Sequence, residues 1–155
     1  MKMVYLSVLY LLLLANCKST VSDNTETTYA DVVSVNVSGS ENNYTFAITL
    51  KSPDKGCTQY ANWWEVISTD GLLIYRRILA HSHVNEQPFT RSGGPVNIRD
   101  DSVVMVRAHM HPSGYESGEI AMKGSVKTGF TAFEIAEDFA ATLEDQDPLP
   151  SGCAF

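Results

Sequence analysis

The stretch that decides the fold is residues 33–50, VSVNVSGSENNYTFAITL. Apolar residues occupy every second position in its two halves, at 33, 35 and 37 and again at 44, 46, 48 and 50. This period of two is typical of strands with one buried face. Between the halves, residues 39–43 (GSENN) are of the kinds that form turns. The stretch therefore predicts a β-hairpin.

Similar strand signals follow at short intervals along the chain. We expect strands at about 63–67, 72–83, 96–98, 103–111 and 121–126. Residues 88–95 contain two prolines and two glycines, and we expect a loop there. Short strands at this spacing, without alternating helices, favour a mainly β fold over a parallel α/β sheet. The predicted architecture is an antiparallel β-sandwich, immunoglobulin-like or cupredoxin-like.

Residues 133–143 follow a different pattern. Apolar side chains at 133, 136, 139, 140 and 143 fall on one face of a helix, and most of the acidic residues fall elsewhere. This spacing predicts one short C-terminal helix that packs over an end of the sheet.

Composition limits the classes of function. A chain of 155 residues with 44% apolar residues is long and apolar enough for a domain with a core, which excludes a disordered polar chain. Its 11 basic and 18 acidic residues give a net charge of −7. Nucleic-acid binders need a positive footprint, so we expect no nucleic-acid partner.

The amino terminus has the pattern of a secretory signal. Lys2 precedes an apolar run over 3–15, which is shorter than the roughly 20 residues that span a bilayer. We therefore expect residues 1–16 to be a signal peptide. Residues 17–29 are rich in Ser, Thr, Asn and acidic residues and predict a flexible tether. Residues 30–155 are expected to form a single β-sandwich domain.

The sequence Leu14-Ala15-Asn16-Cys17 resembles the lipobox of bacterial lipoproteins, in which the cysteine is lipidated and becomes the first residue. The resemblance implies lipid on Cys17, a membrane partner through that lipid, and a location at the outer face of a bacterial membrane. Asn16 stands where that family has Gly, Ala or Ser. Ordinary cleavage, with release to the periplasm or the outside, and an uncleaved anchor remain alternatives.

Cys57 and Cys153 are left once Cys17 is assigned to lipid. An exported chain meets an oxidising compartment, so we expect these two cysteines to form a disulfide. Two unrelated thiols are the alternative.

All four histidines occur in two pairs, His81-Ser82-His83 and His109-Met110-His111. Residues two apart in a strand share a face and lie about 7 Å apart, so two neighbouring strands would bring four imidazoles together. Imidazole binds copper and zinc, and Glu86 would add a carboxylate. The spacing thus predicts a copper or zinc site of His81, His83, His109, His111 and Glu86. A hydrogen-bonded structural cluster and a ligand pocket without metal are the alternatives.

Two resemblances involve these histidines. His81-x-His83-x-x-Glu86 followed by Gly93 is similar to the first motif of the cupins, which implies a metal-dependent enzyme. The longer run WWEVISTDGLLIYRRILAHSHVNEQPFTRSGGPV, followed by VRAHMHPSGY, resembles a family of uncharacterised exported proteins. That second resemblance implies a domain over roughly residues 50–130 and no particular activity.

The sequence contains no GxSxG, GxxxxGK or HExxH motif, so nothing in it favours an enzyme of those classes. We therefore expect an exported, lipid-anchored binding protein of the cell envelope. A cupin-type metal-dependent enzyme and a structural or interaction module without metal are the alternatives.

Overall fold

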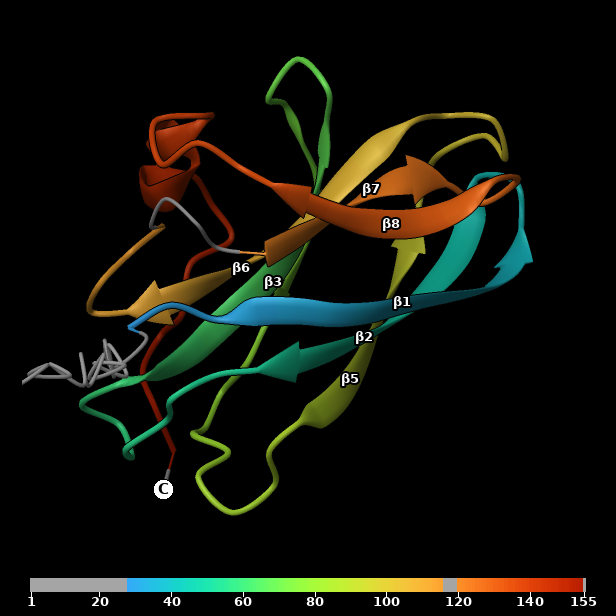
Figure 1. Cartoon of the computed structure of the whole chain (residues 1–155). Coiled ribbons are helices and arrows are strands. Elements are labelled where there is room, and N and C mark those ends of the chain that lie inside the picture. The colour runs from blue at the N-terminus through green and yellow to red at the C-terminus, as the bar shows by residue number, and fades with distance from the viewer. Residues whose placement is uncertain (1–27, 116–119, 155) are drawn as a thin grey trace, which may run out of the picture.

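The computed structural model describes residues 28–115 and 120–154. Within them the chain forms two antiparallel sheets (Figure 1) with strand orders β1-β2-β5 and β4-β3-β6-β7-β8. The elements are β1 Asp31–Ser40, β2 Asn43–Lys51, β3 Tyr60–Ser68, β4 Leu73–Ile78, β5 Phe89–Val96, β6 Val104–His111, β7 Ile120–Ser125, β8 Gly129–Glu134 and the 3-10 helix η1 Ala141–Asp145. The antiparallel, mainly β architecture is therefore confirmed.

The predicted signal peptide, Cys17 and most of the predicted tether lie outside the described residues. No helix in the described part of the chain is long and apolar enough to cross a membrane.

The predicted hairpin is β1 and β2. Val35 pairs with Ile48, and the apolar face of β2 is completely buried at Ile48 and Leu50. Gly39 has a φ of 107°, and a Cβ atom there would lie 2.6 Å from the Asn43 carbonyl oxygen. The turn therefore requires glycine at this position.

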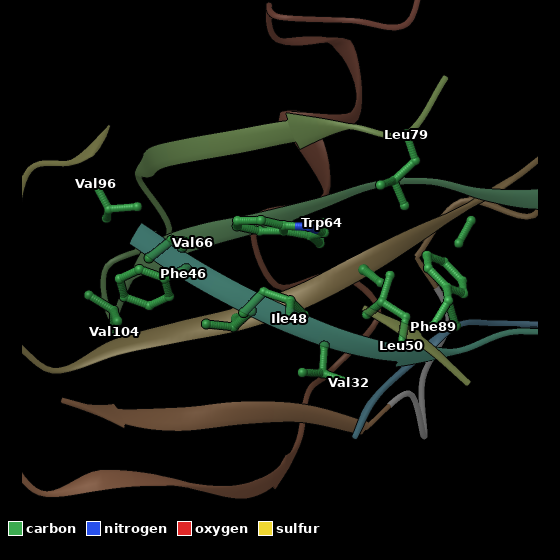
Figure 2. Close-up of a cluster of buried hydrophobic side chains, with 14 of the residues drawn as sticks. Val32, Phe46, Ile48, Leu50, Trp64, Val66, Leu79, Phe89, Val96 and Val104 are labelled. Carbon is green, nitrogen blue, oxygen red and sulfur yellow. The ribbon is translucent and has the colours of Figure 1, made fainter. Parts of the chain in front are cut away.

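The main hydrophobic core lies between the two sheets. Figure 2 shows Phe46 and Ile48 of β2 in the same layer as Trp64 and Val66 of β3, and all four side chains are fully buried. Burial of side chains of this size contributes about 1.5–3 kcal/mol each. Packing between the sheets is thus the main source of stability.

Strands β3 and β6 are buried on both faces, because the chain after β8 covers the outer face of the five-stranded sheet (Figure 1). Part of this cover is apolar. A second cluster consists of Ile67, Met105, Ala121, Ile135 and Leu143. The rest of the outer face is polar and forms the centre of the candidate site.

Residues 89–96 form the edge strand β5, so the prediction of a loop over 88–95 was wrong. A Cβ atom at Gly93 would lie 2.6 Å from the Tyr75 hydroxyl, and one at Gly94 would lie 2.6 Å from the Tyr44 carbonyl oxygen. The glycines therefore permit close approach of neighbouring groups. Proline at position 95 is tolerated because an edge strand leaves one side unpaired.

The short C-terminal helical segment is present, but it is the 3-10 helix Ala141–Asp145 and does not extend over 133–143. Phe133 continues β8 and pairs with Ala121 of β7. Ala140 has a left-handed backbone conformation with φ 51°, which interrupts any regular helix through this region.

Candidate functional site

Glu65 of β3 is the centre of a buried ion network on the outer face of the five-stranded sheet. Strand register places Arg76 of β4 and Arg107 of β6 directly opposite it, one on each side. Arg76 Nη2 donates to one carboxylate oxygen at 2.6 Å, and Arg107 Nε donates to the other at 2.8 Å. The Tyr115 hydroxyl donates to the second oxygen at 2.8 Å. The three charged side chains are completely buried, so the carboxylate needs all of these donors.

The two arginines also hold the covering segment in place. Arg107 donates to the carbonyl oxygens of Phe139 at 2.7 Å and Ala140 at 3.0 Å. Arg76 donates to the carbonyl of Leu143 at 2.6 Å and to two further carbonyls, those of Gln146 and Pro148. The C-terminal segment therefore satisfies guanidinium groups that the sheet alone leaves without enough acceptors.

Aromatic rings extend this network towards the surface. His109 stacks on Trp63 with ring centroids 3.6 Å apart and an interplanar angle of 8°. The Arg76 guanidinium lies 4.4 Å from the Trp63 ring centroid, and Trp63 Nε1 donates to the Tyr115 hydroxyl at 3.2 Å. Trp64 points into the core instead, so the two neighbouring tryptophans serve opposite faces of β3.

His109 has both ring nitrogens engaged. Its Nδ1 lies 2.6 Å from the side-chain oxygen of Asn62, and its Nε2 lies 2.8 Å from Glu144 Oε1. Burial lowers the pKa of His109 to about 4, although Glu144 opposes that shift. The imidazole is therefore neutral at pH 7, and its one N–H group donates to only one of these two oxygens.

A groove of about 410 Å³ opens beside His109. Its walls come from β3, from β6, from the C-terminal segment and from the disulfide between Cys57 and Cys153. The lining residues that matter for chemistry are Tyr60, Asn62, Trp63, His109, His111 and Glu144. The volume lies within the range of small-molecule sites. Sequence analysis had singled out only the two histidines of this set, because Glu144 is remote in the chain and belongs to no motif.

The predicted disulfide is confirmed. Cys57 and Cys153 are bonded, with their Cα atoms 5.6 Å apart, and they lie 96 positions apart in sequence. The Ala154 amide also donates to the Ala80 carbonyl at 2.7 Å. These links fix the end of the covering segment, and with it one wall of the groove.

The other histidine pair lies in a different place. His81 and His83 have ring centroids 4.4 Å apart and line a cavity of about 100 Å³ together with Arg77 and Arg91. Glu86 forms an ion pair with Arg91, 2.7 Å between Oε2 and Nη2. None of these residues lines the groove beside His109.

The structure therefore does not bring the two histidine pairs together as expected. Strand β4 ends at Ile78, before His81, and β6 is flanked by β3 and β7. The two pairs thus do not lie on neighbouring strands, which was the premise of the shared site. The described residues contain no group of three or more His, Cys, Asp or Glu side chains placed to hold a metal ion. A copper or zinc site remains a prediction without structural support.

The chain is similar to a protein of Halomicrobium mukohataei named "Putative lipoprotein". The two are 34% identical over 119 residues, which cover 73% of this chain and 58% of the relative. The chain thus spans less than two thirds of the length of that relative. No protein-family model matches the chain, and no solved structure matches it.

Proposed function

We propose that the protein is an exported lipoprotein, attached to the outer face of a membrane through lipid on Cys17, that binds a small molecule in the groove beside His109. The name of the similar protein supports the attachment, and so do the apolar run over 3–15 and the lipobox-like sequence before Cys17. A single lipid chain binds membranes only weakly, so stable attachment requires the two or more chains typical of lipoproteins.

The observation on which the binding function depends is a groove with fixed walls. Trp63 and His109 are held by stacking, and Glu144 is held by its hydrogen bond to His109. The disulfide and the arginine–carbonyl contacts fix the opposite wall. A site whose side chains are already ordered loses little entropy when a ligand binds.

The lining chemistry indicates which ligands fit. Aromatic rings offer apolar contact, and the Glu144 side chain is 46% exposed, so its carboxylate is accessible to a ligand. No lysine or arginine is among the described residues that line the groove. We therefore expect neutral or positively charged ligands with a planar apolar part, rather than anions.

Binding fits this groove better than catalysis by a side-chain nucleophile. His109 and Glu144 resemble a base and its orienting partner, but the described lining includes no serine, threonine or free thiol beside them. Both lining cysteines are bonded to each other. Because a nucleophile must lie within hydrogen-bond reach of its base, the described lining favours recognition over covalent catalysis by a hydroxyl or thiol.

A thermal-shift screen of the mature protein against small molecules tests the groove. Compounds that raise the melting temperature of the wild type are expected to lose that effect with Glu144→Gln. They are expected to keep it with Glu134→Gln, an exposed carboxylate on β8 that is absent from the groove lining. Equal shifts with both variants would place the binding elsewhere.

The attachment is tested separately in cells that produce the full chain. Metabolic labelling with a radioactive fatty acid should mark the wild type, and Cys17→Ser should remove both the label and the association with membranes. Membrane association that persists without label in Cys17→Ser would show an uncleaved anchor instead.

A further inference from the structure

His83 is a buried side chain whose polar atoms lack partners. Its side chain is 1% exposed, and neither ring nitrogen has a hydrogen-bond partner among the described residues. The nearest carboxylate oxygen, Asp54 Oδ2, is 3.9 Å from Nδ1, beyond hydrogen-bonding distance. Leaving a buried polar group without a partner costs about 1–3 kcal/mol. Such a group calls for a physical explanation, because most buried polar atoms in proteins are paired.

The position of this imidazole is well defined. Its ring stacks on Phe89 with centroids 3.8 Å apart and an interplanar angle of 8°. Its backbone amide donates to Asp54 at 2.7 Å, and its carbonyl accepts from Gln87 at 3.2 Å. The ring is therefore held in one orientation on the wall of the small cavity.

The same wall carries two positive charges beside apolar residues 78–80. Arg77 and Arg91 both line the cavity with His81 and His83. Arg77 Nε donates to the Ser92 carbonyl at 3.1 Å, which fixes its guanidinium against β5. Burial lowers the pKa of His83, and the nearby charge of Arg91 lowers it further. The charges of Asp54 and Glu86 oppose this shift, so the groups of the cavity wall that attract an anion are the guanidiniums of Arg77 and Arg91.

From this arrangement we propose that Arg77, His81, His83 and Arg91 form a binding site for a small oxyanion of the phosphate or sulfate type. A neutral imidazole has one N–H group, and no acceptor among the described residues competes with the anion for that of His83. The guanidiniums supply charge-assisted hydrogen bonds, which are stronger than neutral ones. The cavity volume of about 100 Å³ restricts the ligand to an inorganic ion or a similarly small group.

Glu86 competes with the anion for Arg91. Their ion pair is partly exposed, with 30% of the arginine and 55% of the glutamate side chain accessible. Exposed pairs of this kind contribute little free energy, so an incoming oxyanion displaces the carboxylate at small cost. Removal of the Glu86 charge should therefore strengthen anion binding.

The test uses the mature protein, inorganic phosphate as the probe, and the nitrogen-15 resonances of the histidine side chains as the readout. Phosphate should shift the His83 resonances in a saturable way. Arg77→Gln and Arg91→Gln should each weaken binding about 10-fold, as expected for loss of one charge-assisted contact. Glu86→Gln should strengthen it. The matched control is Arg99→Gln, which removes the same charge from an exposed ion pair with Asp101, outside the cavity lining.

Three results would overturn the proposal. The first is an absence of saturable change at His83 in the wild type, a measurement that requires no variant to fold. The second is equal weakening by Arg99→Gln, which would indicate attraction by overall charge alone. The third is a response of His83 to zinc or copper but not to phosphate, which would make its nitrogen a metal ligand.

Discussion

Around the middle of β3, the two faces of the five-stranded sheet are buried by opposite chemistry. On the inner face, Trp64 and Val66 pack against the apolar side chains of β2. On the outer face of the same strand, Glu65 lies between two buried arginines under the C-terminal segment. Apolar contacts are non-directional, so neighbouring side chains can adjust when one changes. A buried ion network needs every partner in place. We therefore expect a single substitution in the network to lower the free energy of unfolding more than a single substitution on the inner face.

Glu65→Gln should produce the largest effect. It leaves Arg76 and Arg107 with a neutral partner in a buried site, and breaking such a network costs about 3–5 kcal/mol. Urea denaturation measures the change in the free energy of unfolding, with Ile48→Val in the core as the comparison at about 0.5–1.5 kcal/mol. A smaller loss for Glu65→Gln than for Ile48→Val would reverse the contrast between the faces.

Loss of the disulfide should have an effect of similar size. The chain-entropy model assigns about 4.7 kcal/mol to a loop of this length, since Cys57 and Cys153 are 96 positions apart. The bridge ends the segment that covers the outer face. Hydrogen exchange of the double Cys→Ser variant should therefore speed up more at residues 141–146 than at the amides of β2. Uniform acceleration over both would mean that the two faces open together.

Acid should weaken the outer face through His109. Its pKa in the folded protein is about 4, below the ordinary value of 6.5, so the unfolded chain binds the proton more strongly between these pH values. The stabilisation from the neutral imidazole is complete above pH 6.5. It decreases by about 3 kcal/mol as the pH falls to 4.

Denaturation of wild type and His109→Gln across this pH range isolates the effect. The variant should show a shallower decrease in the free energy of unfolding, because its remaining dependence comes from His83 and the carboxylates, without His109. Identical slopes for the two proteins would show that His109 takes up its proton equally in both states.

Tyr115→Phe should have the smallest effect. It removes one donor to Glu65 and the acceptor of the Trp63 indole N–H, while the ring remains beneath Arg107 at 3.5 Å. We expect a loss of about 1–2 kcal/mol in the free energy of unfolding. A loss as large as that for Glu65→Gln would mean that the hydroxyl, rather than the arginines, holds the carboxylate.

The sequence predicts structure that depends on neighbouring residues better than structure that depends on distant ones. The β1–β2 hairpin follows from alternation that is visible in neighbouring residues, and it was predicted correctly. Strand β5 was missed because its Gly93 and Gly94 fit against groups on other strands, which no local pattern records.

The site was harder to predict for a similar reason. His109 was identified as chemically important, but its partners Asn62 and Glu144 lie 47 and 35 positions away along the chain. The prediction from histidine spacing assumed that the two pairs lie on neighbouring strands. In the structure the neighbours of β6 are β3 and β7, and neither carries the other pair. Local periodicity indicates which face of a strand a side chain occupies. The order of the strands and the path of the chain determine which other residues contact that side chain.

The carbonyl oxygens that accept hydrogen bonds from Arg76 and Arg107 come from residues 139–148, after the last strand. Protein synthesis proceeds from the amino terminus. In a nascent chain that has emerged only through β8, the guanidinium groups of Arg76 and Arg107 therefore still lack these acceptors. Both sheets can assemble at that stage, but closure of the outer face must follow. Late closure would keep the outer face open until residues 139–148 have been synthesised.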